Sequence, residues 1–276
     1  MDQPREGDKN KSEIQDIGSY FDVSPEGTII NPASQEKIPE NWKAPVEKTV
    51  EIYKSHYGDK LVSVYIRGSV TRGKAIDGVS DIDSIAIVDL DSNELEDISW
   101  SNPLQKEILA AYPFVQRVEI DPVSLTDFKE RNDIPIVLAT QSVCIYGKDI
   151  AEDLPPLHPG KEIFLHLPAM EQIVAKWTKR IEESSDSEAT KRIVSSVMKR
   201  LVRSGSELTA ERSQKYTRDL YPSWKVFAEY YSEKAAEMRQ ALEFSINPTD
   251  NKEVAIMALR NLGKWLYGEY KKQHSK

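Results

Sequence analysis

The stretch VYIRGSVTRGKAIDGVSDIDSIAIV, residues Val64–Val88, decides the fold. A β-rich run ends at Gly68-Ser69, eleven residues follow, and Asp81-Ile82-Asp83 opens a second apolar run. Residues i and i+2 of a strand point to the same face, so the carboxylates of Asp81 and Asp83 project together. Parallel carboxylates repel one another, and a divalent cation removes that conflict; hard oxygen ligands suit Mg²⁺. The spacing therefore predicts a magnesium site at the start of the second strand.

The connection between the two strands has features of a phosphate-binding loop. Gly68 would let a ligand approach the backbone closely, and Ser69 offers a hydroxyl and a backbone N–H. A helix beginning just after Ser69 would direct its N-terminus at an anion. Arg72 is a second candidate for a phosphate contact, with a solvated loop cation as the alternative. Ser80 either binds a phosphate or caps the turn.

Two further carboxylates lie on the next expected strand, in the run Arg117–Asp121 (RVEID). Glu119 lies between two apolar residues, and Asp121 shares its strand face by alternation. Asp121 directly precedes Pro122, where a strand is expected to end. We therefore favour Glu119 as metal ligand and general base, and keep Asp121 as the alternative.

The chain of 276 residues is long enough for two domains. Strand and helix patterns alternate in the first half, and a proline-rich boundary follows at 152–159. The pattern predicts an α+β domain of mixed-sheet type, with helices on one face, followed by an all-α helical bundle. The expected parts are a flexible N-terminal arm over 1–18, a catalytic domain over 19–152 and a helical domain over 160–276.

Individual elements are predicted from hydrophobic period and turn residues. The strands are expected at 61–66, 82–90, 115–123 and at the end of 134–146, and the helices at 45–56, 103–112, 125–131, 169–182, 188–205, 207–218, 221–231, 233–244 and 252–271.

The two halves differ in charge. Residues 1–150 hold 16 basic and 27 acidic side chains, whereas the remainder holds 21 basic and 18 acidic ones. A phosphate ligand would find carboxylates in one half and cations in the other. Arg203, Lys215 and Arg218 are the candidates to reach a triphosphate from the helical half, and a solvated surface is the alternative for each.

The ordered combination of Gly68-Ser69, the eleven-residue spacer, Asp81-Ile82-Asp83 and Glu119 resembles the signature of the DNA polymerase β-like nucleotidyltransferase superfamily. Within it the chain is most similar to the bacterial aminoglycoside (streptomycin/spectinomycin-type) adenylyltransferases, over about residues 45–150. The stretch 214–220 is more similar to uncharacterised bacterial nucleotidyltransferase-domain proteins. Arg67 departs from the pattern, because that position is usually apolar or aromatic.

The resemblance implies a two-metal Mg²⁺ site at Asp81, Asp83 and Glu119, with ATP or another NTP as substrate. It implies transfer of NMP, AMP in the first instance, to a hydroxyl of a small molecule such as an aminoglycoside-like compound, with release of pyrophosphate. The alternatives are transfer to tRNA or to a protein, as in toxin–antitoxin pairs, and a non-catalytic nucleotide-binding module.

The remaining expectations concern location and assembly. No stretch approaches the roughly 18 apolar residues of a membrane span, and the polar N-terminus does not match a signal peptide. The single cysteine, Cys144, suits a reducing compartment. We therefore expect a cytoplasmic enzyme, monomeric or homodimeric, with no membrane partner.

Overall fold

The computed structural model describes residues 12–130 and 133–274. The chain forms two compact units, one spanning Ile29–Leu157 and the other combining the described residues up to Thr28 with those from His158 onward. Within these residues no helix combines the length and hydropathy that crossing a membrane requires.

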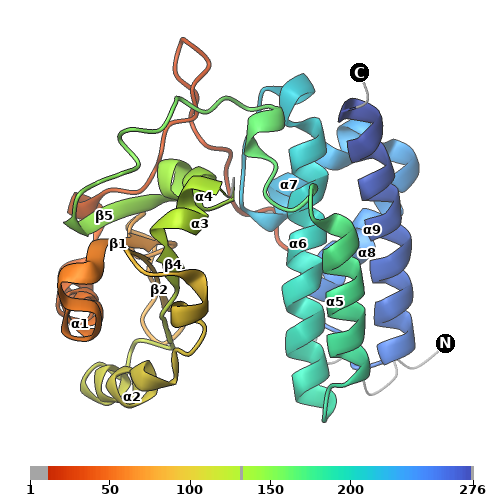
Figure 1. The fold of residues 1–276 in the computed structure, drawn as a ribbon. Helices are drawn as coiled ribbons and strands as arrows, with labels where there is room; N and C mark the ends of the chain where they lie inside the picture. Colours follow the sequence, from red (N-terminus) through yellow and green to blue (C-terminus); the bar gives the residue numbers. More distant parts are fainter. Residues whose placement is uncertain (1–11, 131–132, 275–276) are drawn as a thin grey trace. The chain divides into compact units, whose positions relative to one another are not determined.

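The unit Ile29–Leu157 is built on a five-stranded mixed sheet (Figure 1). Strand β1 pairs antiparallel with β2 on one side and with β5 on the other, while β2 pairs parallel with β3 and β4. This arrangement confirms the predicted mixed-sheet α+β class. The strands are β1 (Leu61–Arg67), β2 (Ile82–Val88), β3 (Val118–Glu119), β4 (Pro122–Ser124) and β5 (Ser142–Gly147).

The single strand predicted over 115–123 consists of two short ones. Asp83 lies beside Glu119 on β3, and Ala86 lies beside Pro122 on β4. Strands β3 and β4 therefore pair with β2 in one continuous register. The ladder is interrupted between them because the backbone N–H of Asp121 is donated to the Tyr53 hydroxyl instead, at 2.9 Å.

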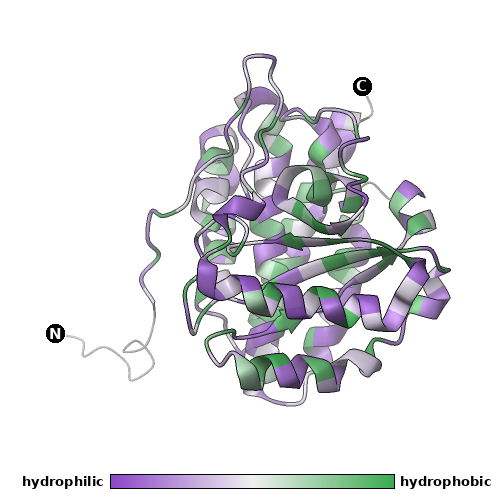
Figure 2. Cartoon of the chain, turned by 90° about the vertical axis from the view of Figure 1, so that its left-hand side faces the viewer, coloured by the Kyte–Doolittle hydropathy of each residue, from purple (hydrophilic) through white to green (hydrophobic). Residues whose placement is uncertain are grey.

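Helices cover both faces of this sheet, which corrects the expectation of helices on one face (Figure 1). Side chains of β1 alternate: Val64 and Ile66 belong to one buried core and Tyr65 to the other. Because both faces are buried, the strands are largely apolar throughout, as the mostly green sheet in Figure 2 shows. Helices α1 (Glu40–Tyr57) and α2 (Asn102–Ala111) cover the first face, and α3 (Leu125–Glu130) and α4 (Asp133–Gln141) the second.

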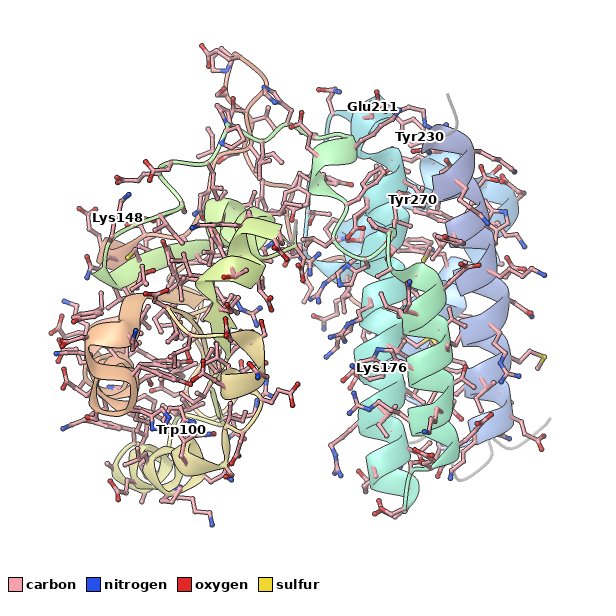
Figure 3. The ribbon with its side chains drawn as sticks, in the orientation of Figure 1. Trp100, Lys148, Lys176, Glu211, Tyr230 and Tyr270 are labelled. Atoms are coloured by element: carbon pink, nitrogen blue, oxygen red, sulfur yellow. The ribbon has the colours of Figure 1, made fainter. Side chains whose placement is uncertain are left out.

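Trp100, labelled in Figure 3 beside α2, packs that helix onto α1. Its ring stacks on His56 with 3.6 Å between centroids and meets Tyr57 edge-on. Burial lowers the pKa of His56, which favours the neutral form of the stacked imidazole.

The second unit is helical, as predicted, and its helices enclose one apolar core. Tyr270, labelled in Figure 3 on the last helix, meets the buried Phe164 edge-on at 5.9 Å. The helices are α5 (Met170–Glu182), α6 (Ser187–Ser213), α7 (Leu220–Tyr230), α8 (Ala235–Ile246) and α9 (Lys252–His274).

Helix α6 replaces two predicted helices. Gly205, where the first of those two helices was predicted to end, lies inside α6. An added Cβ there would come within 2.5 Å of Met238 and 3.0 Å of the Phe227 ring. The glycine therefore serves close packing of α7 and α8 on α6. The helix ends at Gln214, which adopts the left-handed conformation with φ 54°.

The N-terminal segment differs from the predicted flexible arm where the structure describes it. Residues 1–11 lie outside the described residues, but Ser12 exchanges two hydrogen bonds with Asn247. Further along, Phe21 packs edge-on against Tyr216 and donates its N–H to the Tyr216 carbonyl. Residues 12–28 therefore belong to the helical unit rather than to the sheet unit, which begins at Ile29 instead of at residue 19.

Candidate functional site

The candidate carboxylates gather where β2 begins. Asp81 directly precedes β2, and Asp83 is its second residue. Across the sheet, Asp83 is flanked by Arg67 on β1 and by Glu119 on β3. The structure thus places one acidic residue between a cation and a second acid on three adjacent strands.

Two arginines bridge these carboxylates. Arg67 Nη2 lies 3.4 Å from Glu119 Oε2 and 3.9 Å from Asp83 Oδ1. Arg117 Nη2 lies 2.9 Å from Asp81 Oδ2 and 3.7 Å from Glu119 Oε2. The result is one cluster of three acids and two bases.

The electrostatics of the cluster centre on Asp83. The pKa of the Asp83 carboxyl is raised to about 6, first by burial and then by a hydrogen bond with the Glu119 carboxyl, while the positive charges of Arg67 and Arg117 act in the opposite direction. Positive charge beside two hydrogen-bonded carboxyl groups stabilises their ionised forms.

Gly68 directly follows β1 and faces Asp83. Its φ is +88°, and an added Cβ would lie 2.8 Å from Asp83 Oδ2. Glycine is required here for two independent reasons, the left-handed backbone and the close approach of the carboxylate.

We expect Gly68→Ala to lower stability by about 1–2 kcal/mol through backbone strain and also to lower activity by displacing Asp83. Gly78→Ala is the matched control, because Gly78 has φ +78° with nothing within 4 Å of the added Cβ. Urea unfolding and kcat are measured for both variants. Equal losses of activity in the two would contradict the contact with Asp83.

No helix begins after Ser69, which corrects that expectation; the segment forms consecutive turns. Ser80 closes the loop: its hydroxyl accepts from the Ser69 hydroxyl at 3.1 Å and from the Ile76 N–H at 2.9 Å. Arg72 Nε donates to the Gly68 carbonyl at 3.2 Å. Ser69, Arg72 and Ser80 are thus brought together around Gly68, and their predicted contacts with phosphate stay predictions.

The predictions missed a buried polar chain that holds β3 in place. Asp121 N–H donates to Tyr53, whose hydroxyl lies 2.8 Å from Ser84, and the Ser84 hydroxyl in turn donates to the Glu119 carbonyl. Tyr53 is fully buried, and burial raises its pKa. The signal was Ser84, a hydroxyl in the apolar run IDSIAIV, because a buried hydroxyl needs a partner. The role of Arg117 was also missed, although it shares a strand face with Glu119.

The three cations expected to reach a triphosphate lie in the helical unit. Arg203 is partly buried, donates to the Arg218 carbonyl at 3.0 Å, and has its pKa lowered to about 9 by burial and then by Arg218 and Arg200. Arg218 lies 3.8 Å from the buried Glu207. Lys215 is 43% exposed and 4.0 Å from Glu229. Arg203 and Arg218 thus make contacts within the helical unit, Lys215 is the more exposed at 43%, and the predicted contacts of all three with a triphosphate stay predictions.

The same network predicts a pH dependence of folding. His166, with its side chain 15% exposed, bonds Glu207 at 2.9 Å, and burial lowers the His166 pKa more than Glu207 raises it, with Arg218 and Arg200 also lowering it. Because the folded state favours the neutral imidazole, His166 contributes its full share to the free energy of unfolding above its unfolded pKa of about 6.5. That contribution is lost as the pH falls below this value.

The thermal midpoint of wild type should therefore fall more between pH 7 and pH 5 than that of His166→Asn. His158→Asn, at a 48% exposed position, is the control and should follow wild type. Parallel pH profiles for wild type and His166→Asn would contradict the prediction.

The donor chemistry of the acidic cluster fits a hard divalent cation, since Asp81, Asp83 and Glu119 offer only carboxylate oxygens. Over 12–130 and 133–274, however, no three His, Cys, Asp or Glu side chains are already grouped as a metal site. Arg117 already pairs with Asp81, so a cation would replace Arg117 as the partner of that carboxylate.

Comparison with known proteins finds likeness among solved structures only. No protein-family model matches the chain, and no curated protein matches its sequence. A solved structure that is similar is spectinomycin adenyltransferase AAD(9) from Enterococcus faecialis with ATP and spectinomycin. It is 17% identical with a TM-score of 0.46, and the alignment covers 80% of this chain and 98% of that one. A likeness at this level does not extend that protein's ligands to this chain.

Proposed function

We propose that the chain is a Mg²⁺-dependent nucleotidyltransferase that transfers NMP, in the first instance AMP from ATP, to a hydroxyl of a small-molecule acceptor. The observation that carries the proposal is the register of Asp83 beside Glu119 on adjacent strands, with Asp81 before β2. Gly68 keeps the space next to Asp83 free of a side chain.

In the proposed reaction the acceptor oxygen bonds to the α-phosphorus while the bond from that phosphorus to the bridging oxygen of the β-phosphate breaks. Pyrophosphate leaves, and the proton of the acceptor hydroxyl passes to the Glu119 carboxylate. Asp81, Asp83 and Glu119 would hold magnesium, which supplies positive charge to the attacking and leaving oxygens when bound. Arg67, beside Glu119 and Asp83, adds fixed positive charge to the same place.

Binding of the nucleotide is assigned to the loop that follows β1. The backbone at Gly68 and the hydroxyl of Ser69 would contact the phosphates, with Arg72 beside them. Ser80, whose hydroxyl already has two protein partners, shapes the loop. The predicted phosphate contacts of Arg203, Lys215 and Arg218, which belong to the helical unit, stay predictions.

A small-molecule acceptor of cationic character suits the excess of acidic side chains in residues 1–150. The arginine–carboxylate pairs favour one other candidate, a nucleotide-binding module without catalysis, since Arg117 already neutralises Asp81.

The test is incubation of the protein with Mg²⁺ and each α-labelled NTP, alone, with an aminoglycoside panel and with total tRNA. Label on a small-molecule acceptor is the expected result. Label confined to the tRNA fraction would overturn the small-molecule assignment. Nucleotide binding in equilibrium dialysis without turnover on any acceptor would favour the non-catalytic module.

A further inference from the structure

Arg67 is the unusual member of the acidic cluster. It directly precedes Gly68 at the end of β1, opposite Asp83 on one side and Ser142 on the other. Its Nη2 atom lies 3.4 Å from Glu119 Oε2 and 3.9 Å from Asp83 Oδ1. The guanidinium is therefore close to the carboxylates of both Glu119 and Asp83.

The position of this guanidinium is fixed by its surroundings. The side chain is 28% exposed, and its buried Nε has no hydrogen-bond acceptor among the described residues. A buried donor without an acceptor is destabilising. Strand β1 and the ion pairs with Asp83 and Glu119 hold the side chain in place, rather than a hydrogen bond from Nε. Strand β1 is hydrogen-bonded to a neighbouring strand on each side, which further restricts the movement of the Arg67 backbone.

Arg117 contrasts with Arg67 in this respect. Its side chain is 61% exposed, although it contacts Asp81 and Glu119. An exposed arginine can leave the cluster for solvent at little cost, whereas a half-buried one next to two acids cannot.

We infer that Arg67 is a built-in cation that takes one of the places a divalent ion would otherwise fill, so that the site binds a single divalent cation, at Asp81 and Asp83. The inference rests on the proposed function. When a metal ion binds and all three carboxyls are ionised, the cluster carries three negative charges; Arg67 neutralises one, and one divalent cation neutralises the other two once Arg117 has moved into solvent. A second divalent ion would have to lie beside Asp83 and Glu119, where the Arg67 guanidinium is already within 4 Å of both carboxylates.

The first experiment measures binding of Mn²⁺ alone to the metal-free full-length protein, by electron paramagnetic resonance of the free ion and by calorimetry. Wild type is expected to bind one ion in this cluster. Arg67→Met, which keeps the length of the side chain and removes its charge, is expected to bind a second ion, with overall affinity raised by about tenfold or more. Arg117→Met is the matched control and is expected to keep the wild-type stoichiometry. Two equally tight ions in wild type, or identical titrations of wild type and Arg67→Met, would overturn the inference.

Thermal unfolding in EDTA and in Mg²⁺ separates a charge role from a packing role. Arg67→Met should lose stability in EDTA and recover most of it in Mg²⁺, because the ion replaces the missing charge beside Asp83 and Glu119. Arg67→Lys, which keeps the charge, should behave as wild type in both media and serves if Arg67→Met does not fold. An equal loss in EDTA and in Mg²⁺ would show that Arg67 only packs.

The two proposals fail separately. Arg67-dependent Mn²⁺ stoichiometry without turnover on any acceptor would defeat the proposed function and leave the built-in cation standing. Turnover with two ions bound in wild type would do the reverse.

Discussion

Asp83→Asn is expected to lower kcat for nucleotidyl transfer by about a thousandfold or more, equivalent to about 4 kcal/mol of transition-state stabilisation. Asp83 is the central carboxylate, flanked by Arg67 and Glu119 on the neighbouring strands. Replacing it by asparagine, its neutral isostere, removes the carboxylate that any cation bound in the cluster would need as a ligand. The fold should survive, because the same change removes the repulsion between two adjacent carboxylates; we expect the thermal midpoint to shift by only a few degrees.

Asp89→Asn is the matched control for this prediction. Asp89 follows the opposite end of β2 and is exposed, so an acid is neutralised next to the same strand without touching the cluster. Wild-type kcat and metal dependence are expected there. Full activity in Asp83→Asn with unchanged metal dependence would remove Asp83 from the site.

The second large effect is expected at Glu119. Glu119→Gln should lower kcat by about a hundredfold to ten-thousandfold, the contribution typical of a general base, with little change in nucleotide binding. The physical reason is position: Glu119 pairs with Asp83, whereas the Asp121 carbonyl accepts from Ala86, three residues further along β2.

Asp121→Asn is the comparison variant, since it neutralises the competing acid two residues away. Its kcat should stay within a few fold of wild type, because Asp121 lies beside Ala86, three residues further along β2 than Asp83. Both variants are measured for kcat and, separately, for binding of the nucleotide. A large loss in Asp121→Asn with near-normal Glu119→Gln would reverse the assignment.

Much of the sheet unit could be predicted from local pattern. The strands at 61–66 and 82–90 were predicted within about two residues of β1 and β2, since apolar β-branched runs bounded by turn residues have few alternatives. The adjacency of Asp81 and Asp83 followed from strand alternation. The placement of Glu119 beside Asp83 could be predicted only as a resemblance, because strand order and register depend on contacts between residues far apart in the chain.

Other features were inaccessible to local reasoning. Gly205 carries the composition signal of a helix break, yet α6 continues through it because Phe227 and Met238 pack against it. The segment 69–80 has the composition of a phosphate loop leading into a helix, but hydrogen bonds to Ser80 close it as turns. In both cases the competing interaction comes from elsewhere in the chain.

The sequence by itself determined most of the elements, the mixed α+β class, the helical second half and the identity of the acidic residues, because hydrophobic period and residue chemistry act over a few neighbouring positions. Only the tertiary structure decided that Arg67 and Arg117 lie among those acids, that Tyr53 and Ser84 fasten β3, and that residues 12–28 pack with the helices. The physical reason is that charge pairing and buried hydrogen bonds depend on distances of 3–4 Å between residues far apart in the chain, which a linear pattern does not encode.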